Sequence, residues 1–406
     1  MARIMIGLTA LLVGAALVAE AAPAGKGQPQ QPPAKAAAKA ETAKKGDAAK
    51  GESGELSVNA QAAILGDIDS GRILFEQNAD EVRAPASLTK VMTLYLIYEA
   101  LANGDIKLDD LATVSETAWK VGGSKTFVGV GDKVRVEDLV LGIAVQSGND
   151  ACVVMAEHLA GTEEGFAQLM NKKAKQLGMN DSHFVNASGL PDPNHVTTAR
   201  DLFTLARALI KNYPQYSHFS REKQYTFNGI LQYNRNTLLH KDPSVTGLKT
   251  GHTQEAGYCL IATNEKDGQR LSAVILGSQS PKVREEEALK LRRHGGRMYE
   301  TVRFFDVGAK VGQLRVWKGD KEQVDATVRE MVAVTVLRKE RAGLEVGLTY
   351  QEPLTAPITA GQQIGTVVVK LAGQELLRKP VVAVQEVKEG GFFKRMSDAA
   401  RLKFGL

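Results

Sequence analysis

The chain has 406 residues, of which 43% are hydrophobic and 24% are charged, as in ordinary globular proteins. This composition excludes a wholly disordered or fibrous chain, and a net charge of +5 is too small for a dedicated nucleic-acid binder. Two cysteines are too few for a disulfide scaffold, and the seven histidines show no paired metal-ligand spacing. Glycine-rich dinucleotide and Walker motifs are absent, so we expect no cofactor, no metal and no nucleic-acid partner.

The N-terminus has the pattern of an export signal. Arg3 precedes an uncharged apolar run over Ile4–Val18, and Ala19-Glu20-Ala21 forms a small-x-small cleavage site. The run is shorter than the ~20 residues of a membrane span, which favours cleavage after Ala21 over an anchor helix. Residues 1–21 are therefore predicted to be a signal peptide. Residues 22–57 are rich in Ala, Lys and Pro, have little apolar surface to bury, and are predicted to be a disordered linker.

The first ordered domain is predicted at residues 58–306. Its pattern begins with a hairpin, continues with helices, and ends with antiparallel strands and one more helix. This order favours an α+β domain in which helices cover an antiparallel sheet. The expected elements are strands at 63–65 and 73–75, helices at 87–102, 136–144, 150–159, 164–176 and 199–211, strands at 247–250, 258–263 and 271–276, and a helix at 285–301.

Two further segments follow. Short β-branched runs at 332–336, 344–348, 364–371 and 376–384 predict a small all-β domain at residues 307–389. Residues 390–406 are predicted to form an amphipathic helix that lies on an anionic membrane surface. The alternative is a helix packed on its own domain. On a helical wheel the apolar face holds Phe392, Phe393, Met396, Ala399, Ala400 and Phe404, whereas Lys394, Ser397, Asp398 and Arg401 lie opposite.

The first chemical motif is Ser87-Leu88-Thr89-Lys90. Residues three apart share one face of a helix, so the Lys90 ammonium can reach the Ser87 hydroxyl. A serine is a weak nucleophile until a base takes its proton, and burial can lower the pKa of a lysine until it serves as that base. The helix that follows is very apolar, and a lysine at the start of a buried helix requires a specific reason.

Two more motifs follow in the chain. Ser147-Gly148-Asn149 comes between an apolar run and the next predicted helix, and Lys249-Thr250-Gly251 ends a predicted strand. Each motif alone is more often structural: a helix cap in the first case, a strand end in the second. Together, in the order Ser-x-x-Lys, Ser-x-Asn and Lys-Thr-Gly, they form the signature of penicillin-interacting serine acyl transferases.

With these motifs the chain resembles the D-alanyl-D-alanine carboxypeptidases among the low-molecular-mass penicillin-binding proteins, especially the type-five subgroup. The resemblance runs from about Ser57 to Leu406 and includes the residues around the second and third motifs and the terminal Gly391-Phe392-Phe393. It implies a penicillin-binding transpeptidase/β-lactamase-like domain followed by a β-rich domain. It also implies a periplasmic location, peripheral on the outer face of the cytoplasmic membrane.

The family resemblance assigns a role to each catalytic candidate. Ser87 would attack the carbonyl between the last two D-alanines of the peptidoglycan stem peptide, and Lys90 would be the base. Ser147 would relay a proton to the leaving amine, and Asn149 would position Lys90 and the substrate. The backbone N–H groups of Ser87 and His252 would form the oxyanion hole.

The substrate ends in a free carboxylate, which requires cations and hydroxyls to bind it. Lys249 and Thr250 fit that need, with Gly251 and His252 beside them. Arg284 and Arg235 align with arginines near the family's carboxylate pocket, although a surface salt bridge explains either equally well. The expected partners are therefore the peptidoglycan stem peptide and β-lactam antibiotics.

Three competing functions are a β-lactamase, a DD-endopeptidase and a catalytically silent wall-binding protein. A class A β-lactamase uses a glutamate to activate the deacylating water. Glu163 and Glu164 lie too close to Ser147 in the sequence to match that loop, and residues 184–201 contain no glutamate. The intact motifs disfavour a silent protein, and endopeptidase activity on cross-linked peptide stays open. A disulfide between Cys152 and Cys259 also stays open, although a small buried role is commoner for such cysteines.

Overall fold

The computed structural model describes residues 3–5 and 56–404. The predicted signal peptide and linker lie almost entirely outside the described residues. Arg3–Met5 form a short strand, β1, which pairs antiparallel with β15 (Leu344–Thr349). None of the helices among the described residues has the length and apolar character of a membrane span.

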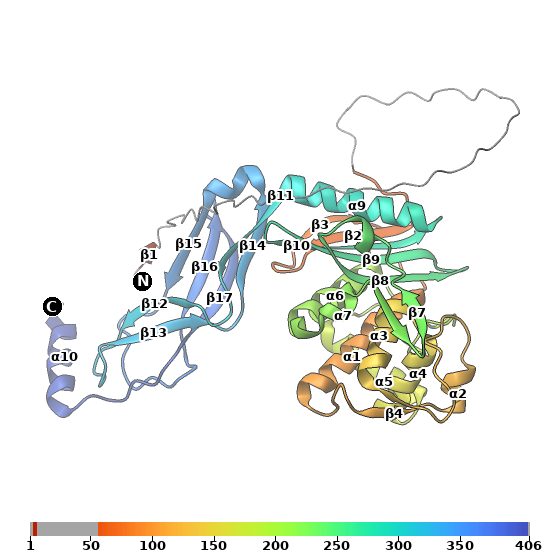
Figure 1. Cartoon of the computed structure of the whole chain (residues 1–406). Helices are drawn as coiled ribbons and strands as arrows, with labels where there is room; N and C mark the ends of the chain where they lie inside the picture. The colour runs from red at the N-terminus through yellow and green to blue at the C-terminus, as the bar shows by residue number, and fades with distance from the viewer. Residues whose placement is uncertain (1–2, 6–55, 405–406) are drawn as a thin grey trace, which may run out of the picture. The chain divides into compact units, whose positions relative to one another are not determined.

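The first domain contains a five-stranded antiparallel sheet in the order β3-β2-β10-β9-β8 (Figure 1). The predicted strands are present, and most extend beyond the predicted limits. Because β9 and β10 run in opposite directions on either side of a short turn, their long apolar runs pair directly. The strands are β2 Ala62–Asp67, β3 Ile73–Gln77, β8 Val245–Thr253, β9 Gly257–Lys266 and β10 Gln269–Ser278.

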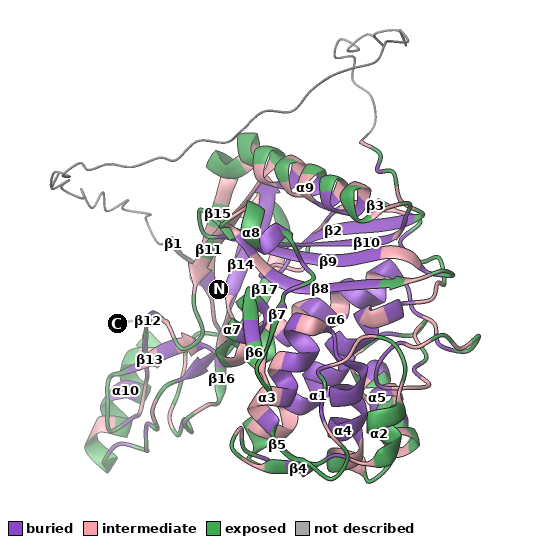
Figure 2. Ribbon diagram, turned by 45° about the vertical axis from the view of Figure 1, so that its right-hand side comes forward, coloured by how far each residue is buried: buried purple, intermediate pink, exposed green. Residues whose placement is uncertain are grey.

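Helices cover both faces of this sheet. Every residue of β2 is buried, because successive side chains point to opposite faces and each face is covered. Leu65 lies against Gly295 of α9 (Pro281–Met298), whereas the next residue, Gly66, lies against Phe203 of α6 (Ala199–Asn212). Figure 2 shows these strands buried and the outer side of α9 exposed.

The helical part packs around α1 (Lys90–Asn103), whose first nine residues are all buried. This helix contacts α4 (Asn149–Ala160), α5 (Glu163–Leu177) and α6. Together these helices form one continuous apolar core with the inner face of the sheet. The remaining elements are η1 Ala86–Thr89, α2 Glu116–Lys120, α3 Val136–Leu141, η2 Gly142–Gln146, η3 Pro214–Tyr216, α7 His218–Arg221 and α8 Leu238–Lys241, with the hairpins β4 Leu111–Thr113/β5 Lys133–Arg135 and β6 Gln224–Phe227/β7 Ile230–Tyr233.

The second domain is all-β, as predicted, and has its own apolar core. Its larger sheet has the order β1-β15-β16-β17-β13-β12, and a two-stranded sheet joins β11 to β14. The predicted helix at 285–301 is wrong at its end. The helix stops at Met298, because the β-branched and aromatic residues that follow pair with β14 as a strand. The strands are β11 Tyr299–Phe305, β12 Lys310–Arg315, β13 Gln323–Val328, β14 Val332–Leu337, β16 Gln363–Leu371 and β17 Gln374–Ala383.

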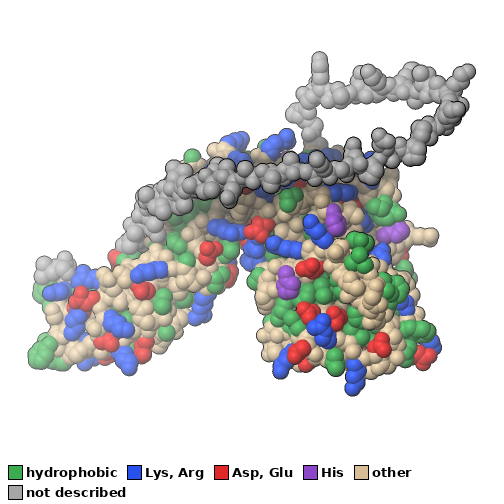
Figure 3. Space-filling view, viewed as in Figure 1, with side chains coloured by type: hydrophobic (Ala, Val, Ile, Leu, Met, Phe, Trp, Pro, Cys, Tyr) green, Lys and Arg blue, Asp and Glu red, His purple; other side chains and the backbone are tan. Residues whose placement is uncertain are grey.

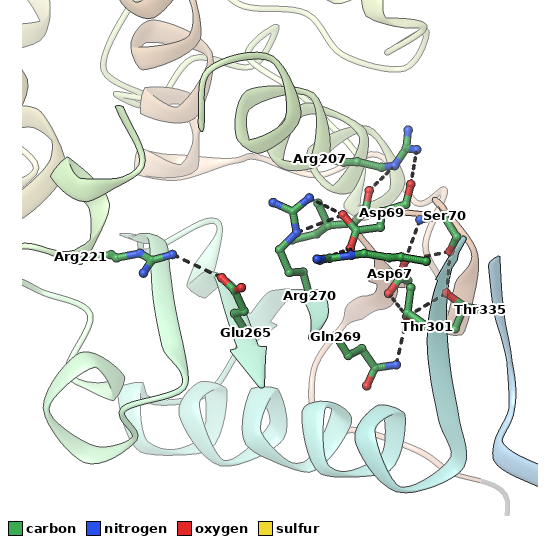
Figure 4. A network of polar contacts seen from close by, with 12 residues as sticks. Asp67, Asp69, Ser70, Arg207, Arg221, Glu265, Gln269, Arg270, Thr301 and Thr335 are labelled. Atoms are coloured by element: carbon green, nitrogen blue, oxygen red, sulfur yellow. Dashed lines mark hydrogen bonds and ion pairs between the residues drawn. The ribbon is translucent and has the colours of Figure 1, made fainter. Parts of the chain in front are cut away.

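A polar network ties β11 to the turn between β2 and β3 (Figure 4). The Asp69 carboxylate is fully buried and pairs with Arg270 on β10 and with Arg303 on β11, the latter at 2.6 Å. Burial alone would raise the pKa of Asp69, but the hydrogen bonds and charges of the two arginines outweigh it and hold that pKa low. Thr301 also donates to Asp67 at 2.5 Å. Asp67, Asp69, Arg270, Thr301 and Arg303 thus form one cluster in which two carboxylates lie beside two arginines.

The predicted C-terminal helix is present as α10 (Phe392–Phe404). The architecture therefore confirms the predicted order of an α+β domain, an all-β domain and a terminal helix.

Candidate active site

The first motif lies where η1 runs into α1. Ser87 is in the 3₁₀ turn, and Lys90 is the first residue of the α-helix. Side chains three residues apart eclipse one another in a 3₁₀ turn, so the two lie one above the other. The Lys90 Nζ donates to Ser87 Oγ at 3.0 Å. The serine and the lysine are therefore in direct contact.

The Lys90 side chain is fully buried and makes two more hydrogen bonds. Its Nζ donates to Asn149 Oδ1 at 2.7 Å and to the Ser188 carbonyl oxygen at 2.6 Å. All three partners of Nζ are neutral oxygen atoms, and burial disfavours the charged ammonium. Burial, helped by the Arg235 charge and opposed by Cys152 and Asp150, lowers the pKa of Lys90 to about 8. A lysine with this pKa is partly unprotonated near neutral pH and can accept a proton.

Ser147 follows an irregular turn. The α3 helix runs into η2, a π-helical turn, and Ser147 then adopts a left-handed backbone with φ +66°. Such conformations are strained for residues other than glycine and concentrate at functional sites. The Ser147 hydroxyl is buried and has no hydrogen-bond partner among the described residues. It is therefore available to a group that enters the site.

Asn149 is the first residue of α4 and joins three segments. Its Oδ1 accepts from Lys90, and its Nδ2 donates to the Gly122 carbonyl at 2.7 Å. The next residue, Asp150, accepts from the backbone N–H groups of Thr126 and Phe127 at 2.7 and 2.9 Å. The start of α4 thus fixes both the lysine and the loop at 122–127.

The third motif lies on β8, the edge strand of the sheet. A Cβ at Gly251 would lie 3.1 Å from the Ser87 nitrogen, so the glycine allows β8 to approach the nucleophile turn closely. Lys249 and Thr250 are buried beside it, and the Lys249 Nζ donates to the Thr250 carbonyl at 2.9 Å. His252 is exposed, and its ring stacks on Tyr258 with centroids 4.0 Å apart.

Four basic side chains lie in this part of the site: Lys90, Arg235, Lys249 and Arg284. The pKa of Lys249 lies well below its ordinary value because of burial, with further repulsion from Lys90, Arg235 and Arg284 that Cys152 partly offsets. Like charges held together favour a carboxylate, since an anion relieves their repulsion. The site is therefore suited electrostatically to a substrate that ends in a carboxylate.

The two arginines reach the site differently. Arg235 is exposed, and its Nε donates to the Gln146 carbonyl at 2.8 Å, next to Ser147. Arg284 is buried at the start of α9, and its Nη1 lies 3.4 Å from the carbonyl oxygens of Gly251 and Cys259. Arg284 therefore contacts the backbone of β8 and β9 from within the protein, whereas Arg235 lies at the surface of the site.

The sequence motifs did not indicate the turn at residues 186–190, which also binds the Lys90 side chain. The Asn186 Oδ1 accepts from the N–H groups of Ser188, Gly189 and Leu190, which shapes a tight turn that presents the Ser188 carbonyl to Lys90. Gly189 has φ +79°. The run Asn186-Ala-Ser-Gly has the composition of such a turn, but its sequence does not show what it faces.

The two cysteines and possible metal ligands are the remaining candidates. Cys152 and Cys259 are both buried and free, so the disulfide left open from the sequence does not form. Burial raises the pKa of the Cys152 thiol to about 12. Within residues 3–5 and 56–404, no cluster of His, Cys, Asp or Glu side chains could hold a metal ion.

The sequence is similar to those of known proteins. A family model described as D-alanyl-D-alanine carboxypeptidase matches residues 48–280, and one described as penicillin-binding protein 5, C-terminal domain, matches residues 299–389. D-alanyl-D-alanine carboxypeptidase DacC of Escherichia coli (strain K12) is 42% identical over 356 residues, which cover 86% of this chain and 89% of that protein.

Solved structures agree with these matches. Penicillin binding protein 5 from Haemophilus influenzae superposes with a TM-score of 0.73 at 35% identity, covering 83% of this chain and 100% of that one. The ampicillin-bound form of penicillin-binding protein D2 from Listeria monocytogenes has a TM-score of 0.55 at 33% identity and covers 60% of this chain and 100% of that one.

Gly189 provides a test of the turn behind the lysine. A Cβ there would lie 1.9 Å from the Ala86 carbonyl oxygen, in addition to the strain of a left-handed residue. Gly189→Ala should therefore lower the free energy of unfolding by about 3 kcal/mol, measured by urea denaturation. Gly178→Ala is the matched control, because Gly178 has φ +80° but open space around it, and should cost about 1 kcal/mol. Equal losses in the two variants would contradict the packing described here.

Proposed function

The chain belongs to the D-alanyl-D-alanine carboxypeptidase family, and we propose that Ser87 is its acylated nucleophile and Lys90 the base. The expected enzyme class is confirmed: the chain is a serine-type carboxypeptidase with a penicillin-binding fold. That fold implies a peptidoglycan substrate and binding of β-lactams. The observation that supports these two roles most directly is the 3.0 Å hydrogen bond between the buried Lys90 and Ser87.

Acylation begins with a proton transfer. Unprotonated Lys90 takes the proton of Ser87, and the Ser87 oxygen forms a bond to the carbonyl carbon between the last two D-alanines. The carbonyl oxygen gains negative charge, and the N–H groups of Ser87 and His252 are placed to stabilise it by family resemblance. The approach of β8 to the nucleophile turn at Gly251 supports this pairing of donors.

Collapse of this intermediate breaks the peptide bond. The proton passes through Ser147 to the leaving amine, so free D-alanine departs and the shortened stem peptide stays as an ester on Ser87. The Ser147 hydroxyl suits this relay because no described group already occupies it. Water then hydrolyses the ester, with Lys90 as the base, and Asn149 holds the lysine in place through both steps.

The terminal carboxylate of the substrate binds among the cations of the site. Lys249 and Thr250 contact it, and Arg235 and Arg284 contribute positive charge. The lowered pKa of Lys249 supports this role, because an arriving carboxylate stabilises its protonated form.

A β-lactamase is the less favoured function. Glu163 lies close enough to Lys90 to raise its pKa, but its Oε1 accepts from the Ala187 N–H at 2.9 Å. That contact assigns Glu163 to the turn behind Lys90 rather than to a hydrolytic water. An acyl-enzyme formed with penicillin is therefore expected to persist.

Two measurements on the purified protein test the proposal. With a stem pentapeptide, mass spectrometry should show loss of a single alanine, and with fluorescent penicillin a stable adduct should map to the peptide that contains Ser87. An adduct on Ser147 instead would overturn the assignment of the nucleophile. Rapid loss of the penicillin adduct would identify a β-lactamase, and cleavage only of cross-linked dimers would identify an endopeptidase.

Acylation should depend on pH through Lys90. The base acts only when unprotonated, so the second-order rate of penicillin acylation should rise with a midpoint near pH 8 and level off above it. Arg235→Gln removes a nearby cation and should move the midpoint to higher pH. Arg221→Gln is the control, because Arg221 pairs with Glu265 at 3.6 Å and should leave the midpoint unchanged. A midpoint that is the same in all three proteins would refute lysine as the base.

We also propose that α10 binds a membrane surface. Asp398 is its one buried residue among those described, and its Oδ2 accepts from the Lys318 N–H at 2.7 Å. The helix therefore docks on its own domain through its polar side. Its apolar side chains face solvent: Phe393 is 86% exposed, and Phe392, Met396 and Phe404 are exposed too. Figure 3 shows hydrophobic side chains gathered at the surface over the start of this helix.

This orientation is the reverse of a helix that stabilises a globular domain, which buries its apolar face. An apolar face that points outward, with Arg395 and Lys403 beside it, fits an anionic lipid surface. With the predicted signal peptide, we place the protein in the periplasm, peripheral on the outer face of the cytoplasmic membrane.

Vesicle binding tests this placement. Phe393→Ser with Phe404→Ser should lower binding to anionic vesicles at least tenfold, since burying each phenylalanine contributes about 1.5–3 kcal/mol. Binding of the unaltered protein should fall as salt rises. Val307→Ser removes another exposed apolar side chain, outside the helix, and is the control. Equal binding to neutral and anionic vesicles, or unchanged binding of the double variant, would overturn the role of α10.

A further inference from the structure

A buried threonine and histidine lie directly behind the nucleophile turn and have no part in the chemistry described above. Thr89 is fully buried, and His195 is nearly so. The Thr89 Oγ1 and the His195 Nε2 are 2.8 Å apart, and the same Oγ1 is 2.8 Å from the Ala86 carbonyl oxygen. The three groups form one chain of hydrogen bonds that ends on the residue before Ser87.

The direction of every proton in this chain can be assigned. The Val185 N–H donates to the His195 Nδ1 at 3.2 Å, so Nδ1 carries no proton and Nε2 must carry the proton of the neutral ring. Burial lowers the pKa of His195 to about 4, which keeps the ring neutral at physiological pH. The Nε2–H therefore donates to Thr89, and the Thr89 hydroxyl donates to the Ala86 oxygen.

The Ala86 carbonyl belongs to the same peptide unit as the Ser87 N–H. A trans peptide is planar, so its C=O and N–H point in opposite directions. A hydrogen bond from Thr89 that fixes the direction of the Ala86 C=O therefore also fixes the opposite direction, in which the Ser87 N–H points. Ala86 requires such a restraint, because its backbone is left-handed with φ +47°.

We propose that Thr89 and His195 are positioning residues that aim the Ser87 N–H at the substrate carbonyl oxygen by holding the opposite end of its peptide unit. Hydrogen bonds in series also polarise one another, so a C=O that accepts from Thr89 makes the Ser87 N–H a stronger donor. The inference rests on the proposed function, because it assigns to Ser87 both the attacking oxygen and an oxyanion donor.

This role differs from ordinary stabilisation of the core. A purely structural hydrogen bond would affect the free energy of unfolding and leave the rate per folded molecule unchanged. An oriented oxyanion donor acts mainly on the transition state, so its loss lowers kcat with little change in KM.

The experiment compares variants on one helix. Thr89→Val removes the hydroxyl and should lower kcat on the stem pentapeptide, and the rate of penicillin acylation, by about 10- to 100-fold, with KM within about twofold. Thr89→Ser keeps the hydroxyl and should restore most of the rate. Tyr95→Phe is the control on the same helix: its buried hydroxyl accepts from Asn212 Nδ2 at 3.0 Å and has no part in the site. It should lose stability but keep kcat within about twofold.

Histidine variants extend the test if Thr89→Val does not fold. His195→Gln can still donate from near the position of Nε2, whereas His195→Leu cannot, so the glutamine variant should be the faster of the two. Equal kcat in Thr89→Val and Tyr95→Phe, or in the two histidine variants, would overturn the positioning role. An unaltered protein that neither releases D-alanine nor forms a penicillin adduct would instead overturn the proposed function itself.

Discussion

A primary amine held away from water by three neutral oxygen atoms is the constraint on which the site depends. Removing the Lys90 amine from water disfavours its charge, and only full hydrogen bonding makes its burial tolerable. Its three partners, Ser87, Asn149 and Ser188, come from η1, the start of α4 and the 186–190 turn. Packing of these three segments around α1 therefore creates the base and places it against the nucleophile in one step.

The sequence predicted the parts of this arrangement that depend on local geometry. Residues three apart must lie together at the start of a helix, so the contact of Ser87 with Lys90 follows from spacing alone. The order of the three motifs indicated the family and its fold. Apolar runs indicated the five strands of the first domain's main sheet and four strands of the second domain, whereas β11, β12 and β13 were not predicted. Each of these inferences needs only nearby residues or a characteristic order of motifs.

The remaining features depend on distant segments. Nothing near residue 90 in the sequence indicates that the Ser188 carbonyl, 98 residues later, completes the lysine's environment. The left-handed backbone of Ser147 follows a π-helical turn that its apolar sequence does not signal. Likewise the helical wheel of α10 showed two faces, but only tertiary contacts show that Asp398 is the buried side. The end of α9 was missed because β11 forms by pairing with β14.

The two buried, unpaired thiols have a consequence for how the protein matures. They are the chain's only cysteines, and both are free, so no covalent cross-link supports either domain. Stability comes instead from two large apolar cores and the buried ion-pair cluster at Asp69. Folding therefore needs no thiol oxidase or disulfide isomerase, and the same structure can form in a reducing or an oxidising compartment.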